Sequence, residues 1–188
     1  MFDKDNIRKS IRTIIESIGE NPNREGLKET PRRVADMYAE LFSGMSMDPI
    51  EELKTGFEQG HREMVIVKDI PFYSMCEHHL LPFYGEVHIG YIPDNSGHIV
   101  GISKLARVVE IVARRPQVQE RMTTEIADTI MQGLKPSGVV VVVKAEHMCM
   151  IMRGVKKPGS HIITSAIRGI FYENAASRAE FFSLIQTK

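Results

Sequence analysis

The sequence has no apolar run that could cross a lipid bilayer. Such a run needs about 18 residues, whereas the longest apolar stretch, 138–143, has the length of a strand. There is no excess of charge either, since 24 Lys and Arg balance 24 Asp and Glu. Proteins that bind nucleic acids or membrane surfaces usually carry a cationic excess, so we expect neither partner. The G-x-x-x-x-G-K-[ST] motif is also missing, which excludes a P-loop GTPase.

Cysteine is scarce, with two residues among 188. The N terminus is polar from its third residue and lacks the apolar core of a signal peptide. We therefore expect a cytoplasmic protein whose thiols stay reduced. Two cysteines in that compartment more often serve a metal or catalysis than a disulfide.

Hydrophobic periodicity divides the chain into two parts. Amphipathic helices over 6–20 and 30–42 bury too little to fold alone, so we assign 1–60 to an N-terminal helical appendage and 61–188 to a second domain. The second domain has predicted strands over 64–67, 87–92, 139–152 and 161–171, and predicted helices over 102–112, 116–134 and 174–186. This ββααββ order predicts an α+β fold of antiparallel hairpins with helices packed on one face.

Both cysteines have histidines beside them. Cys76 and His79 have C-x-x-H spacing, so one tight turn can present both side chains to a single ion. From the spacing alone, His78 could be the ligand in place of His79. Thiolate and imidazole are the ligands that zinc prefers, which makes this turn a candidate metal site.

Cys149 is the candidate third ligand. If 145–153 is extended, His147, Cys149 and Arg153 all point to one face of a strand. Three protein ligands leave an open position on zinc, as in a catalytic site. Two simpler readings are a buried free cysteine and a zinc-stabilised interaction module, which would need a fourth protein ligand.

Four motifs stand in order along the second domain: S-M-C-E-H-H-L-L-P at 74–82, G-H-I-V-G-I-S-K-L-A-R at 97–107, R-R-P-Q-V-Q-E-R at 114–121 and H-M-C-M-I-M-R-G at 147–154. Together they closely resemble the GTP cyclohydrolase I family, and the likeness extends from about Thr30 to Phe182. The resemblance implies the tunnelling fold (T-fold), in which subunits join their sheets into a barrel and two pentamers form a homodecamer with shared active sites. It also implies that GTP and water become formate and 7,8-dihydroneopterin triphosphate, the first step of tetrahydrofolate and pterin biosynthesis.

Matched motif by motif, the resemblance implies that Cys76, His79 and Cys149 bind a zinc ion as cofactor. It leaves His78 and His147 as proton-transfer groups, which we expect to be catalytic. The 61–188 region is then the catalytic domain.

Substrate-binding residues follow from the same motifs. Glu120 resembles the family's guanine anchor, because a carboxylate can accept hydrogen bonds from N1–H and the amino group of guanine, and the adjacent Gln119 is a weaker candidate. The triphosphate site is matched by four residues: Ser103, Lys104, Arg107 and Arg153. In the second N-terminal helix, Arg32 and Arg33 could add phosphate contacts, whereas Asp36 could not.

An alternative is that the chain is another T-fold enzyme, such as a member of the nitrile reductase branch. That branch needs a nicotinamide cofactor and a catalytic cysteine without zinc. Two cysteines, each flanked by histidine, argue against it.

Overall fold

A computed structural model describes residues 2–187 of the protein. The chain divides into two compact units, Met1–Ser43 and Gly44–Lys188. The boundary between them precedes the domain boundary expected at residues 60 and 61, which stays a prediction. None of the helices in the described part of the chain has the length and apolar character needed to span a membrane.

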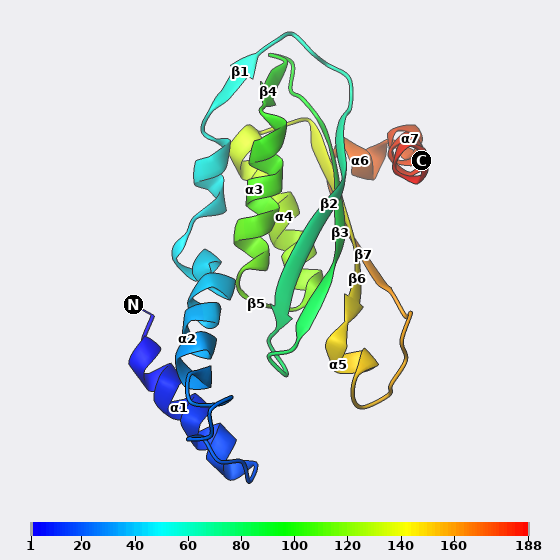
Figure 1. The fold of residues 1–188 in the computed structure, drawn as a ribbon. Coiled ribbons are helices and arrows are strands. Elements are labelled where there is room, and N and C mark those ends of the chain that lie inside the picture. Colours follow the sequence, from blue (N-terminus) through cyan, green and yellow to red (C-terminus); the bar gives the residue numbers. More distant parts are fainter. Residues whose placement is uncertain (1, 188) are drawn as a thin grey trace. The chain divides into compact units, whose positions relative to one another are not determined.

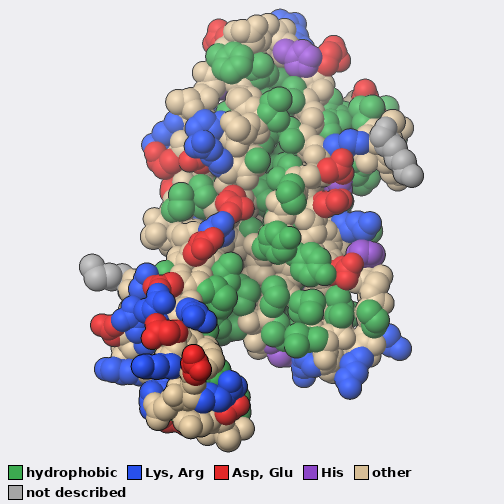
Figure 2. Space-filling model, in the orientation of Figure 1, with side chains coloured by type: hydrophobic (Ala, Val, Ile, Leu, Met, Phe, Trp, Pro, Cys, Tyr) green, Lys and Arg blue, Asp and Glu red, His purple; other side chains and the backbone are tan. Residues whose placement is uncertain are grey.

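The first unit consists of two packed helices, α1 (Lys4–Ser17) and α2 (Thr30–Leu41). Both were predicted from periodicity and are confirmed. The Asp3 side chain caps α1 by accepting the backbone N–H of Asn6, and a proline occupies the first turn of α2. Charged side chains crowd this unit in Figure 2, many of them joined in ion pairs along or between the helices.

The second unit is built on a five-stranded sheet with the order β5-β2-β3-β6-β7. The strands are β2 (Val65–Cys76), β3 (Pro82–Ile92), β5 (Pro116–Gln117), β6 (Gly138–His147) and β7 (Ile162–Gly169). All neighbours pair antiparallel except β5, which runs parallel to β2. The four long strands and the two helices between β3 and β6 confirm the predicted ββααββ order and the α+β class.

Helices lie on both faces of this sheet (Figure 1). Two long helices, α3 (Ile102–Ala113) and α4 (Gln119–Leu134), cover the face that carries the larger hydrophobic core. The short α6 (Ile170–Glu173) and α7 (Ala175–Gln186) pack on the other face against Val140 and Val142. Strand β6 is therefore apolar on both sides over residues 139–143, as expected for a strand buried between two layers.

Smaller elements complete the second unit. The 3₁₀ helix η1 (Ser43–Ser46) begins at the last residue of the first unit. It is followed by the 3₁₀ helix η2 (Pro49–Leu53) and by a two-stranded ribbon of β1 (Gly56–Glu58) and β4 (His98–Val100). The end of η2 packs closely on α4, since a Cβ added at Gly133 would come within 2.6 Å of Leu53 Cδ1.

The prediction of a strand over 139–152 is wrong at its end. Strand β6 stops at His147, and Met148–Ile151 form a helical turn, α5. His147 pairs with Phe83, so the next position on the neighbouring strand is Pro82, the first residue of β3. Proline has no N–H to donate to a ladder, and the sheet ends there. Cys149 and Arg153 therefore do not share a strand face with His147.

The helix predicted to begin at Pro116 begins instead at Gln119. Pro116 and Gln117 are extended and pair with Met75 and Cys76 as β5. Proline suits an extended strand end as well as a first helical turn, so sequence alone did not distinguish the two. The pairing brings the start of α4 beside the end of β2, where the candidate site lies.

Candidate functional site

The turn after β2 carries the C-x-x-H pair. Cys76 is the last residue of β2 and is buried. Its carbonyl accepts the backbone N–H of Leu80 at 2.8 Å, and its own N–H donates to the carbonyl of Leu81 at 2.9 Å. These bonds close a tight turn in which Leu80 adopts a left-handed φ of 51°. The turn holds His79 beside Cys76, as its spacing predicts.

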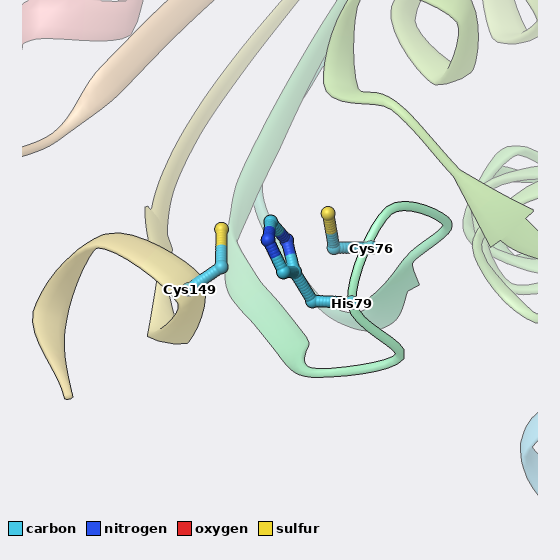
Figure 3. Close-up of side chains that lie close together, drawn as sticks. All are labelled: Cys76, His79 and Cys149. Atoms are coloured by element: carbon cyan, nitrogen blue, oxygen red, sulfur yellow. The ribbon is translucent and has the colours of Figure 1, made fainter. Parts of the chain in front are cut away.

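Cys149 comes to the same place from α5 (Figure 3). The two sulfur atoms and a ring nitrogen of His79 all lie within 4.8 Å of one another. Cys76 is buried, Cys149 half-buried and His79 exposed. Among the described residues this group includes His79 and not His78, so the geometry favours His79 as the third donor.

The donor set of this cysteine cluster (Cys76, His79 and Cys149) fits a soft cation. Burial raises the pKa of Cys149, and the nearby Cys76 raises it further because two adjacent thiolates repel each other. A metal ion reverses this balance by favouring the thiolate form. Zinc with ligand bonds of about 2.0–2.3 Å separates its tetrahedral ligand atoms by roughly 3.3–3.8 Å. A group already within 4.8 Å needs only a small closure to reach that geometry.

Two polar side chains flank the cluster. Arg153 Nη1 donates to Nε2 of His79 at 3.0 Å, which places a permanent cation at the edge of the site. His78 Nδ1 lies 3.8 Å from the sulfur of Cys76, and its Nε2 lies 3.9 Å from Glu77. The His78 side chain is 64% exposed, so it is free to face a ligand in solvent.

His147 sits in a far more enclosed setting. It is only 8% exposed, and its ring stacks on Phe83 with centroids 4.6 Å apart. Its Nε2 lies 2.8 Å from Oε1 of Gln119, whose amide nitrogen points to two backbone carbonyls and to Thr164. Because that nitrogen must donate, Oε1 accepts, and His147 carries its proton on Nε2. Burial lowers the pKa of His147, an effect that Glu120 opposes.

The two neighbouring candidates on α4 differ in their surroundings. Gln119 is buried and its polar atoms are engaged within the protein, so its contact with substrate stays a prediction. Glu120, in the first turn of α4, is exposed and close enough to His147 to influence its charge. Glu120 is thus the carboxylate available to a ligand near the buried imidazole.

The predicted phosphate-binding residues fall into two places. Ser103, Lys104 and Arg107 lie on the first turns of α3, whose N terminus has no side-chain cap. Within residues 2–187, no hydrogen bond or ion pair links Arg153 to Lys104 or Arg107. Arg153 contacts His79 of the cysteine cluster instead.

A carboxylate not found by sequence reasoning lies against these cations. One oxygen of Glu52 is 3.1 Å from Lys104 Nζ and 3.4 Å from Arg107 Nη1. Glu52 and Lys104 are separated by 52 positions in the chain and share no motif. No signal in the sequence could have paired them.

A second group of possible metal ligands lies on the other face of the sheet. Asp69, Glu86 and His88 have donor atoms within 4.8 Å of one another. Nδ1 of His88 already accepts the backbone N–H of Asp69 at 3.1 Å, and the remaining donors are exposed carboxylates. The cysteine cluster is therefore the better site for a soft metal ion.

Comparison with known proteins matches residues 7–186 to the family model of GTP cyclohydrolase I. A GTP cyclohydrolase 1 of Dehalococcoides mccartyi (strain CBDB1) is 70% identical over the full length of both chains. Another, from Pelotomaculum thermopropionicum, is 64% identical and covers 99% of this chain and 98% of its own. A solved archaeosine synthase QueF-like structure aligns with a TM-score of 0.45 and 21% identity, over 56% of this chain and 93% of that one. Nothing about this chain's chemistry or assembly follows from a likeness at that level. The family model and the curated relatives cover nearly the whole chain, and the chain therefore belongs to the GTP cyclohydrolase I family of enzymes.

Proposed function

We propose that the protein carries out the zinc-dependent hydrolysis and rearrangement of GTP to formate and 7,8-dihydroneopterin triphosphate. This reaction would be the first step of tetrahydrofolate and pterin biosynthesis. The observation that carries the proposal is the convergence of Cys76, His79 and Cys149, three soft donors from two distant segments, in a member of this family.

Cys76, His79 and Cys149 would hold the metal ion, with Arg153 beside them. When bound, zinc would supply Lewis-acid chemistry of the kind that hydrolysis of a C–N bond needs. Arg153 now donates to Nε2 of His79, so its guanidinium must exchange partners if that nitrogen binds the metal. A cation released in this way would be available to a substrate phosphate.

The two histidines outside the proposed ligand set, His78 and His147, would transfer protons. His147 has its Nε2 proton engaged by Gln119, which leaves the Nδ1 lone pair of the neutral ring to accept a proton. His78 is exposed and could act on the opposite side of the substrate. The opening of the five-membered ring of guanine and the release of formate need protons at different atoms of the substrate. Two histidines in different surroundings suit these two steps.

Glu120 would select the base. Its carboxylate can accept hydrogen bonds from both N1–H and the amino group of guanine, whereas adenine has no N1–H to donate. Its exposure at the start of α4 and its proximity to His147 support this role. Ser103, Lys104, Arg107 and Arg153 would bind the triphosphate.

We further propose a homodecamer in which neighbouring subunits share each active site. Strand β7 is the last strand of the sheet order, and β2 has only the two-residue β5 on its outer side. Such long open edges are usually covered or paired in native proteins. A shared site would also let Arg153 of one copy meet Lys104 and Arg107 of another. Sedimentation that finds a stable, active monomer would contradict this assembly.

The deciding experiment is incubation of zinc-loaded protein with GTP, following the ultraviolet spectrum, formate release and metal content. We expect formate and a dihydropterin product from GTP and none from ATP. An inert protein with tightly held zinc would favour the interaction module, and dependence on a nicotinamide cofactor would favour the nitrile reductase branch. The cytoplasmic location stays a prediction.

A further inference from the structure

Lys104 and Arg107 share one carboxylate partner from a distant part of the second unit. The bridging Glu52 oxygen lies 3.1 Å from Lys104 Nζ and 3.4 Å from Arg107 Nη1. The Glu52 side chain is 20% exposed and that of Lys104 28%, so this pair is partly withdrawn from solvent, whereas Arg107 is 62% exposed. Hydrogen bonding from Lys104 lowers the pKa of Glu52, which therefore stays ionised at neutral pH.

The backbone of Glu52 is held firmly in this position. It lies in η2, where the Asp48 side chain accepts the backbone N–H of Ile50 at 3.0 Å. The next residue, Leu53, is fully buried against α4. The carboxylate can swing about its side-chain bonds, but it cannot move away with its segment unless Leu53 leaves the core.

We propose that Glu52 occupies the phosphate-binding cations as an internal anion, which an incoming phosphate group must displace. The inference rests on the proposed function, because it takes Lys104 and Arg107 as the phosphate-binding cations. Displacing Glu52 costs two ion pairs, and this penalty falls on every anion that enters. A triphosphate makes several contacts and can overcome the penalty. A small anion such as inorganic phosphate makes few contacts and therefore binds weakly.

Glu52 thus weakens the binding of every anion that uses Lys104 and Arg107, the substrate included. The alternative is that Glu52 holds Lys104 and Arg107 in a binding-ready geometry. The two roles predict opposite signs when the charge of Glu52 is removed. A competing anion predicts tighter phosphate binding, whereas a holding role predicts weaker binding.

The test compares Glu52→Gln with the matched control Glu51→Gln. Glu51 lies on the same 3₁₀ helix but pairs with Lys54 instead of the α3 cations. Glu51→Gln removes one negative charge, as Glu52→Gln does, without changing the charge beside Lys104 and Arg107. Pyrophosphate is titrated calorimetrically into full-length zinc-loaded protein in buffer free of phosphate and sulfate, with zinc content checked before and after. Lys104→Ala, which should weaken pyrophosphate binding by about 10-fold, locates the site.

We expect Glu52→Gln to lower the Kd for pyrophosphate and the KM for GTP by about 3- to 10-fold, since two partly exposed ion pairs no longer compete. Inorganic phosphate should inhibit this variant at correspondingly lower concentrations, and Glu51→Gln should match the parent. Glu52→Asp, which keeps the charge but draws it back, should fall between the two, and thermal unfolding checks that each variant is folded.

The proposal is overturned if Glu52→Gln binds pyrophosphate as weakly as the parent, or more weakly, or if neither protein binds it. If Glu52→Gln tightens pyrophosphate binding but no variant turns over GTP, the proposed reaction fails while the role of Glu52 stands.

Discussion

The cysteine cluster and the cation pair Lys104–Arg107 are completed in opposite ways. At the cluster, two thiols and an imidazole converge, and burial together with their proximity raises the pKa of Cys149. A bound metal ion would favour the thiolate forms of both cysteines. At the cation pair, the balancing charge already comes from Glu52 of the same chain. The cluster therefore gains a partner on binding, whereas the cation pair exchanges one.

This difference predicts a difference in sensitivity to mutation. Removal of one donor from the cluster should greatly weaken metal binding, because the two donors that remain hold an ion less tightly than three. Removing one cation from the pair leaves the other cation with Glu52, in a region that solvent partly screens. We therefore expect severe effects at the cluster and graded effects at the cation pair.

The largest effect is expected from Cys149→Ser. A neutral hydroxyl replaces thiolate poorly, so zinc content should fall and GTP turnover should drop by at least about 100-fold. Metal analysis beside the formate assay measures both. Full zinc occupancy with near-parental activity would remove Cys149 from the set of ligands.

The next effect sharpens the contrast within the cluster region. His147→Ala should retain zinc and lower kcat by about 10²- to 10⁴-fold, the usual contribution of a positioned acid or base. His78→Ala should retain zinc and lose less, because His78 is exposed and loosely held. Single-turnover chromatography should show that at least one of these variants opens the five-membered ring of guanine and then accumulates a formamide intermediate. Parental rates in both variants would make the two histidines bystanders.

A moderate effect is expected at the cation pair. Lys104→Ala should raise KM for GTP by about 10-fold, as expected for the loss of one hydrogen bond to a charged group. Arg107→Ala should raise it less, because Arg107 is more exposed and its bond to Glu52 is longer. Steady-state kinetics at two salt concentrations test this ranking. A loss at Lys104 as complete as that at Cys149 would break the comparison.

The smallest effect concerns His88, on a sheet face outside both regions. Burial lowers its pKa below the ordinary 6.5, although Asp69 and Glu86 oppose the shift. Above pH 6.5 the histidine is neutral in both the folded and the unfolded chain. As the pH falls below 6.5, the unfolded chain takes up a proton first, and stability declines until the pH passes the folded pKa. As the pH falls through this range, the free energy of unfolding of His88→Gln should therefore decrease less steeply than that of the parent. Denaturant unfolding of protein treated with a chelator measures both slopes. Identical slopes for parent and variant would show that His88 does not contribute.

Parts of the site with local causes were predictable from the sequence. The C-x-x-H spacing of Cys76 and His79 fits within one turn, and the turn's geometry depends on only a few residues. The long helices α3 and α4 were readable because each has a repeating apolar face. Cys149 could be linked to the pair through its motif, but its placement on a helical turn depends on where the neighbouring strand β3 begins, at Pro82.

Other parts depended on contacts that no local pattern encodes. The sequence motif made Gln119 a candidate for substrate contact, which stays a prediction. Only the fold shows that it is buried between α4, β6 and β7 with its carbonyl turned to His147. The contact between Glu52 and Lys104 could not be predicted from a local pattern either, because the two residues are 52 positions apart.

The sequence by itself determined the α+β class, the order of the main elements, the family and the residue types of the candidate metal site. These depend on periodicity, short spacings and motifs, which are properties of neighbouring residues. Only the tertiary structure showed how close Cys149 lies to Cys76 and His79, oriented His147 through Gln119 and placed Glu52 on the cation pair. Those outcomes depend on how distant segments pack, because a side chain's partner is set by which surfaces the core brings together.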